Sequence, residues 1–272
     1  MSPPPESLAS AMVLMAGVGA GLVALELSGL RAQLGVGGIL DWGILRTGLR
    51  STSCGAPGRA LQVVYGAAGM SWLVAGQVLA VAVLLLPGAA FEPLPWLVVV
   101  LTVHLLLVLR LGHGIDAGDR MLTLVLVGGV AYYLASGPLA RDVALWFVGA
   151  QGMLAYTAAG WTKLVSARWR SGDALSSILS TRAFGHPRVG SALRAHPCVS
   201  RGLSWVVIAV ECSAPIAVLG GVRTTLLFVG AGLLLHLGIA VVMRLNHFVW
   251  AFAATYPGML HLAGAVDGLL GR

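Results

Sequence analysis

Eight long apolar segments, separated by short polar or Gly- and Pro-containing stretches, constrain this chain more than any other feature of its sequence. A helix needs about 20 apolar residues to cross a bilayer, because each residue rises about 1.5 Å through a hydrocarbon layer about 30 Å thick. The segments that approach this length are 8–30, 61–86, 94–109, 121–137, 143–161, 203–221, 224–243 and 248–266. The sequence therefore predicts an all-α, polytopic transmembrane helical bundle of about eight spans. The prediction allows six or seven, because the third and fourth segments are short and the first contains Glu26.

The composition explains why we expect these segments to lie in lipid. Of the 272 residues, 58% are hydrophobic and only 10% are charged, so a soluble globule of this sequence would expose an excess of apolar surface. The net charge of +7 does not indicate nucleic-acid binding, because the basic residues form no helical stripe beside stacking aromatic residues. The scattered cysteines Cys54, Cys198 and Cys212 predict neither a zinc site nor a disulfide framework.

The basic residues predict how the bundle is oriented. Lys and Arg concentrate in the cytoplasmic loops of membrane proteins. All of the 17 Lys and Arg residues except Arg141, Arg223 and Arg272 fall in the same alternate set of connections. We therefore expect a multi-pass protein of a cell membrane with both termini outside. The connection 166–200 is predicted to be an interfacial segment, with a short amphipathic helix capped by Asp173 and ended near residue 185, or a basic loop that only fixes topology.

Lys163 is the most informative single residue, because it is the only lysine of the chain. Arginine stays protonated in proteins, whereas a partly desolvated lysine can lose its proton and act as a base. On a helix, Lys163 shares a face with Gly152, Tyr156 and Ala159, which would form a groove beside the amine. The alternative interpretation is that Lys163 anchors the helix end at the membrane interface, as lysines in such positions commonly do.

Ionisable residues inside the apolar segments are further candidates. Glu211 lies in the sixth segment, His236 in the seventh and His104 in the third. Such groups are costly in lipid and usually face the bundle interior or a polar cavity. Each histidine could instead be neutral and hydrogen-bonded to a neighbouring helix, and a pair of histidines could ligate haem iron.

A polar loop between the third and fourth segments contains His113, Asp116, Asp119 and Arg120. A histidine and two aspartates can bind a metal ion. A solvated turn is favoured over that reading, so no metal site is predicted.

The fifth segment resembles a known family. The run 151–164, from Gln151 through Tyr156 and Gly160 to Lys163, is followed by Trp169 and Gly172 and resembles the HTTM superfamily, which includes vitamin K-dependent gamma-glutamyl carboxylase. Weaker similarity extends through residues 236–239, Phe248, 253–254 and 37–42. The resemblance implies a single HTTM-like transmembrane domain over 1–272.

The resemblance also implies a site. In the carboxylase, the lysine of this block deprotonates vitamin K hydroquinone, which then reacts with oxygen to drive carboxylation of glutamate. By position, Lys163 is that base here, and we expect a reduced quinone as cofactor. The predicted catalytic residues are Lys163, His236 and Glu211, and the predicted cofactor-binding residues are Tyr156, Gly160, Gln151 and His104.

Three departures limit the resemblance. The animal enzyme has a second lysine where this chain has Thr162, it has a large extramembrane region that this chain lacks, and it acts on the lumenal side, whereas Lys163 is expected near the cytoplasmic face. Bacterial inner-membrane members similar to sporulation-delaying protein B are nearer in size and mature a secreted peptide with a small partner protein. Others accompany thiol-disulfide oxidoreductases. A quinol-using or peptide-modifying enzyme and a non-catalytic membrane partner therefore both stay open. Transport is disfavoured, because no pair of broken helices at midplane is evident.

Overall fold

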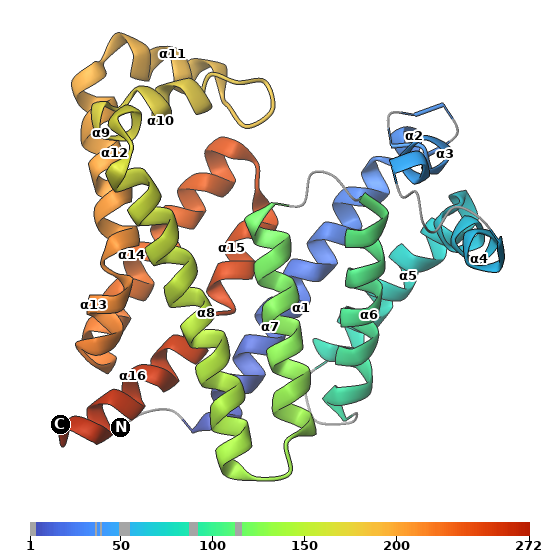
Figure 1. Cartoon of the computed structure of the whole chain (residues 1–272), viewed down its shortest axis with the longest axis horizontal. Coiled ribbons are helices and arrows are strands. Elements are labelled where there is room, and N and C mark those ends of the chain that lie inside the picture. The colour runs from blue at the N-terminus through green and yellow to red at the C-terminus, as the bar shows by residue number, and fades with distance from the viewer. Residues whose placement is uncertain (1–3, 36, 39, 49–54, 87–91, 112–115) are drawn as a thin grey trace.

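The computed structural model describes residues 4–35, 37–38, 40–48, 55–86, 92–111 and 116–272, and the regular elements of this part of the chain are all helices (Figure 1). The first half contains α1 (Pro5–Gly29), α2 (Arg31–Leu34), α3 (Trp42–Leu45), the short 3-10 helix η1 (Arg46–Gly48), α4 (Gly55–Tyr65), α5 (Ala67–Leu84), α6 (Pro93–Leu111) and α7 (Ala117–Leu134). The second half contains α8 (Pro138–Val165), α9 (Ala167–Ser171), α10 (Asp173–Ile178), α11 (Pro187–Ala195), α12 (Pro197–Cys212), α13 (Ala214–Leu219), α14 (Val222–Met243), α15 (Asn246–Ala253) and α16 (Tyr256–Leu270).

Five of these helices are long and apolar enough to cross a membrane: α1, α5, α6, α8 and α14. The expectation of an all-α bundle with several candidate spans is confirmed to this extent. Three segments that the sequence predicts as continuous are interrupted, between α4 and α5, between α12 and α13, and between α15 and α16. Pro215 and Pro257 lie in the first turn after two of the breaks. A proline has no N–H to donate and clashes with the preceding turn, so the helix must restart there.

Helix α14 shows how side chains are distributed between the bundle interior and its surface. Its buried face carries Thr225, Phe228, Gly232 and His236. Its opposite face carries large apolar side chains at seven-residue spacing: Leu227 is 78% exposed, Leu234 is 72% exposed and Val241 is 78% exposed. An apolar outer stripe with a polar group on the inner face suits a helix whose outer solvent is hydrocarbon.

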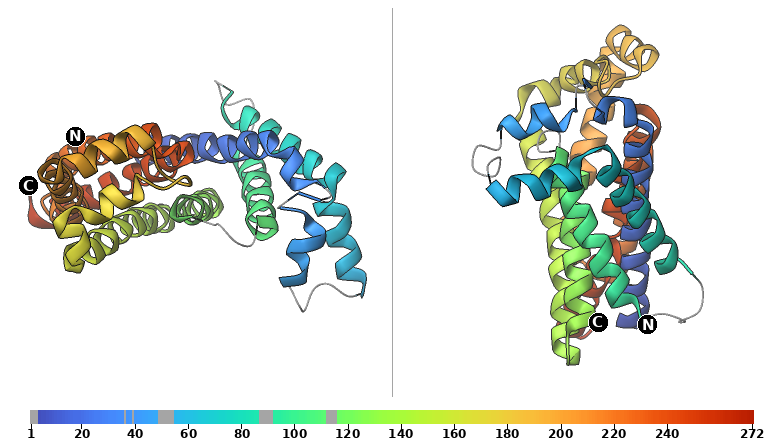
Figure 2. Two further views of the ribbon diagram at one scale, coloured as in Figure 1. Left: turned by 90° about the horizontal axis from the view of Figure 1, so that it is seen from above. Right: turned by 90° about the vertical axis from the view of Figure 1, so that its right-hand side faces the viewer.

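Helix α1 lies in the middle of the arrangement, where it contacts α5, α6, α7, α8, α15 and α16. In Figure 1, α9 to α11 lie at the upper left and α2 to α4 at the right, while both chain termini lie at the lower left. Helices α1 and α5 slant relative to α6, α7 and α8, and the view from above shows one elongated arrangement (Figure 2). The short helices with many of the basic residues therefore lie away from the termini, at opposite ends of the long axis.

The basic connection 166–200 forms three short helices, α9, α10 and α11, in place of the single helix that the sequence predicts. Helix α10 ends at Ile178, well before residue 185, and its N-cap is Gly172 instead of Asp173. Gly172 has φ +89°, and a Cβ there would lie 2.5 Å from the backbone nitrogen of Arg201. Only glycine fits this close approach in a left-handed conformation. The hydroxyl of Ser200 donates to the Gly172 carbonyl at 2.7 Å, which ties this segment to α12.

Candidate functional site

Lys163 and Glu211 form an ion pair between α8 and α12. The Nζ atom of Lys163 donates to both carboxylate oxygens of Glu211, at 2.8 Å to Oε1 and 2.7 Å to Oε2. The two side chains are only 18% and 10% exposed, and the ammonium lies 5.2 Å from the centre of the Trp169 ring. The amine is therefore turned toward α12 and largely withdrawn from the surface of the molecule.

The register of this pair is set by a close approach of the two helices at Gly160. A Cβ on Gly160 would lie 2.7 Å from the backbone nitrogen of Cys212 and 2.9 Å from the carbonyl carbon of Glu211. The backbones of α8 and α12 can touch here only because position 160 carries no side chain. Lys163 follows one turn later on α8, so its amine reaches the carboxylate across the contact.

A second polar group lies on the same face of α8, two turns before Lys163. The hydroxyl of Tyr156 is hydrogen-bonded to Nε2 of His236 on α14 and to the hydroxyl of Tyr256 on α16, both at 2.7 Å. All three side chains are buried, and Phe252 stacks on the imidazole with ring centres 4.4 Å apart. A chain of hydroxyl and imidazole groups in an apolar core can hold and pass a proton between its members.

The structure brings some of the predicted site residues together and keeps others apart. Lys163 meets Glu211, Tyr156 meets His236, and Gly160 lies between them along α8. Gln151 is half-buried three turns before Lys163. His104 belongs elsewhere, because its Nε2 atom is 3.1 Å from the Thr123 hydroxyl and 3.3 Å from the Asp119 carbonyl. His104 and His236 therefore do not lie in one cluster.

Two residues of this region were not singled out from the sequence. Tyr256 begins α16 directly before Pro257, and a hydroxyl at a helix break inside an apolar segment is the signal that could have found it. Cys212 is a free thiol next to Glu211 in the chain. Trp169 was noted only as part of the family pattern, and its ring stacks beside the Lys163 ammonium.

An apolar groove of about 480 Å³ runs along α12 and α14, and several of its lining side chains, such as Leu234 and Val206, are exposed on the outer surface of the bundle. Fifteen apolar residues from α12, α14 and the α10 to α11 segment line it, among them Val207, Val210, Leu235 and Gly238. Val210 and Leu235 are the chain neighbours of Glu211 and His236. A groove of this size and lining suits an acyl or isoprenoid chain.

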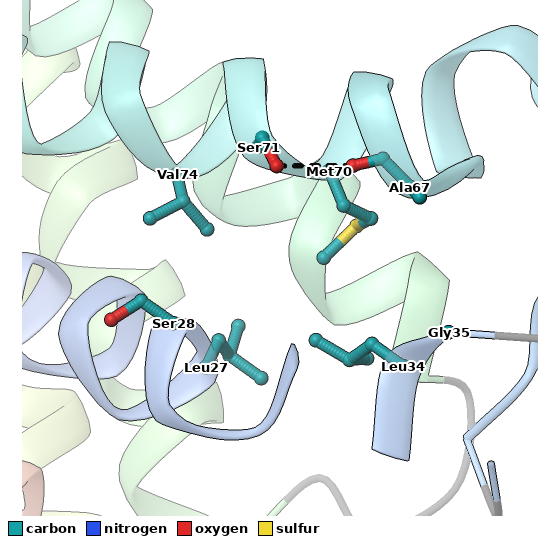
Figure 3. Close-up of a pocket in the computed structure, with 8 residues that line it drawn as sticks. All are labelled: Leu27, Ser28, Leu34, Gly35, Ala67, Met70, Ser71 and Val74. Atoms are coloured by element: carbon teal, nitrogen blue, oxygen red, sulfur yellow. Dashed lines mark hydrogen bonds between the residues drawn. The ribbon is translucent and has the colours of Figure 1, made fainter. Parts of the chain in front are cut away.

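A smaller pocket of about 150 Å³ lies between α1, α2 and α5, far along the chain from Lys163 (Figure 3). Its polar lining comes from Ser28 and Ser71, whose hydroxyls donate to carbonyls of their own helices, Leu25 at 2.6 Å and Ala67 at 3.1 Å. It offers no titratable side chain and is not a candidate for proton chemistry.

Comparison of the chain with protein-family models, with curated proteins and with solved structures finds no match.

Proposed function

We propose that this chain is a multi-pass membrane enzyme that takes a proton from a reduced quinone at the Lys163 and Glu211 pair. The observation that carries the proposal is the contact of the sole lysine, 2.7 Å from a carboxylate oxygen of Glu211 and 18% exposed. All the other Lys and Arg positions of the chain carry arginine, which keeps its proton, so the one lysine stands where a base can act.

The pair suits proton abstraction from a weak acid. In the proposed reaction, Glu211 accepts the proton that Lys163 gives up, and the amine then takes the proton of the quinol. After it accepts the quinol proton, the resulting ammonium lies next to the quinolate and stabilises its negative charge. The quinolate then reduces oxygen, so that one quinol and one O2 give one quinone and one H2O2.

The surroundings supply the other requirements of such a site. The groove along α12 and α14 is proposed to bind the isoprenoid tail of the quinone. The Tyr156 hydroxyl lies on the same face of α8 and is bonded to His236, and this pair is proposed to pass the proton taken up by Lys163 on to the peroxide, which leaves as H2O2. The likeness of residues 151–164 to the HTTM pattern agrees with these roles and extends them to a carboxylase-like or peptide-modifying reaction.

We further propose that the chain crosses the membrane eight times, with the three interrupted helices completing the bundle. By the positive-inside rule, the segments that carry α2 to α4 and α9 to α11 face the cytoplasm of a bacterial inner membrane. Lys163 then acts near the cytoplasmic face.

The test is oxidation of a reduced quinone by the purified protein in detergent. We expect formation of quinone that saturates with quinol concentration and requires oxygen, measured by the absorbance of the quinone. We also expect a lower KM for quinols with longer isoprenoid tails. Glu211→Gln should lower the rate at least tenfold, because general acid and base groups contribute about 100-fold or more to rates. The control is Glu6→Gln, because the Glu6 side chain is exposed in the first turn of α1 and is not part of the proposed site. This variant should leave the rate unchanged. No oxidation by the unmodified protein would contradict the proposal.

The second candidate is a non-catalytic partner in peptide maturation or export, or of a thiol-disulfide oxidoreductase. The same ion pair favours it, because Lys163 and Glu211 also fasten α8 to α12. In that case either lysine or arginine at position 163 keeps α8 fastened to α12, and the protein co-purifies with its partner.

A further inference from the structure

A second cluster of ionisable groups lies where α1, α7 and α15 meet, away from the Lys163 site. The Nε2 atom of His247 lies 3.1 Å from Oδ2 of Asp116 and 4.0 Å from Oδ1 of Asp119. On the other side of the imidazole, Nδ1 lies 3.8 Å from Oε2 of Glu26. The residues come from distant parts of the chain, and only the fold brings them together.

We infer that Asp116, Asp119 and His247 bind one divalent transition-metal cation. One ligand atom from each of the three residues lies within 4.8 Å of the other two. Ligands at about 2.0 to 2.2 Å from a common ion are separated by about 3 Å when adjacent and about 4.3 Å when opposite. The two distances from His247 Nε2, 3.1 Å to Asp116 and 4.0 Å to Asp119, fall within that range.

The second nitrogen of His247 supports the assignment independently. His247 is 8% exposed, and its Nδ1 atom is buried without a hydrogen-bond partner in the described residues. A histidine that binds a metal through Nε2 characteristically donates its Nδ1–H to a carboxylate. Glu26 is placed for that role, and Asn246 steadies it by donating to its Oε1 at 3.3 Å. A bound cation that orients the imidazole would draw Nδ1–H toward Glu26.

The charge of the cluster calls for a cation. Within the part of the chain that the structure describes, no Lys or Arg nitrogen lies within 4.0 Å of Glu26, Asp116 or Asp119. A single histidine therefore faces three carboxyl groups. The side chains of Asp116 and Glu26 are 27% and 43% exposed, so water can reach the site and complete the coordination of an ion.

The backbone holds the ligands in place before any ion arrives. Asp116 is the N-cap of α7 and accepts from the backbone N–H of Asp119 at 3.0 Å through Oδ1, which leaves Oδ2 available. A Cβ at Gly118 would lie 2.9 Å from the Phe248 ring and 3.0 Å from the His247 ring, so glycine allows α15 to approach α7 this closely. The site is therefore built by packing contacts as well as by the charged groups.

The donor set also indicates the class of ion. One imidazole nitrogen with two carboxylates suits Mn²⁺, Fe²⁺ or Zn²⁺, whereas Ca²⁺ and Mg²⁺ prefer sites made of oxygen ligands alone. This inference does not depend on the proposed quinol chemistry.

The test is titration of the EDTA-treated protein with MnCl2, after purification in detergent through a tag without histidine. The electron paramagnetic resonance signal of free Mn²⁺ gives stoichiometry and Kd. We expect one Mn²⁺ per chain, competed by Zn²⁺ and not by an equal concentration of Ca²⁺. His247→Gln and Asp119→Asn should each raise Kd at least tenfold, and Glu26→Gln about tenfold, as loss of an outer carboxylate typically does.

A matched control is present in the same chain. His261 on α16 pairs with Asp142 on α8 at 2.9 Å, but with one carboxylate instead of three. His261→Gln should leave Kd unchanged. The unfolding midpoint should rise with Mn²⁺ in the unmodified protein and in His261→Gln, and stay constant in His247→Gln. If His247→Gln does not fold, the Kd of Asp119→Asn for Mn²⁺ takes its place as the test. The inference is overturned by the absence of stoichiometric Mn²⁺ binding, by tighter binding of Ca²⁺, or by equal Kd values in Asp119→Asn and the unmodified protein.

Discussion

Tyr156 links three helices through a single oxygen atom. Its hydroxyl joins His236 of α14 and Tyr256 of α16 to α8, and the ring is 2% exposed. Within a low-dielectric interior such bonds are strong, and the loss of one partner leaves the others unpaired. The arrangement explains why two polar side chains are tolerated in apolar segments.

Tyr156→Phe should therefore destabilise the bundle. The change leaves His236 Nε2 and the Tyr256 hydroxyl without this partner, and a buried unsatisfied group costs roughly 1 to 3 kcal/mol. Thermal unfolding in detergent should show a lower midpoint. Tyr133→Phe, on a half-buried tyrosine of α7 outside this network, is the control, and equal midpoints for the two variants would argue against the network.

At the residue scale, the sequence identified ionisable side chains that the structure places in contact, but it did not predict which atoms pair. Lys163, Glu211 and His236 stand out because each is an ionisable group among apolar neighbours. Their pairing depends on the rotation and depth of α8, α12 and α14, which no local pattern encodes. The same limit applies to Asp116 and His247, which are 131 residues apart in the chain. His113, named with Asp116 in the sequence, lies outside the described residues.

At the scale of elements, the close crossing of α8 and α16 depends on two glycines. A Cβ on Gly149 would lie 2.4 Å from the Gly258 carbonyl oxygen, and a Cβ on Gly258 would lie 2.7 Å from the Gly149 nitrogen. Small residues that let backbones touch are a common means of helix association in lipid. This contact positions Tyr256 opposite Tyr156.

Gly149→Ala should push the two helices apart. Added atoms in a well-packed contact cost about 1 to 3 kcal/mol, and the shift should also lengthen the hydrogen bond between the two tyrosines. Gly230→Ala on α14 has no atom within 4 Å of the added Cβ and should leave the unfolding midpoint unchanged or raise it. Unfolding midpoints for both variants check this, and an unchanged midpoint in Gly149→Ala would refute the close crossing.

The elements themselves were largely predictable, and their interruptions were not. Apolar runs of the right length became helices because every backbone group must be satisfied internally in lipid. The breaks before Pro215 and Pro257 were overlooked because each proline is flanked by apolar residues that continue the hydrophobic pattern. In the structure each proline restarts a helix, and the shorter pieces α13, α15 and α16 result.

At the scale of the whole molecule, the end of the bundle that carries α9 to α11 decides the orientation. Cys198 is an exposed, free cysteine in the first turn of α12, next to this end. The orientation proposed from the positive-inside rule would put it in the cytoplasm. A variant that keeps Cys198 and replaces Cys54 and Cys212 with serine should react with a membrane-impermeant maleimide only after the cells are permeabilised. Labelling of intact cells would reverse the proposed orientation.

The central claim is that Lys163 acts as a base and does more than join two helices. Lys163→Arg tests it most directly, because arginine keeps the charge and can still pair with Glu211 but cannot release its proton. The variant should elute and unfold like the unmodified protein while its rate of quinol oxidation falls at least about 100-fold, the contribution expected of a general base. A rate within twofold of the unmodified protein would contradict the claim and leave Lys163 as a structural partner of Glu211.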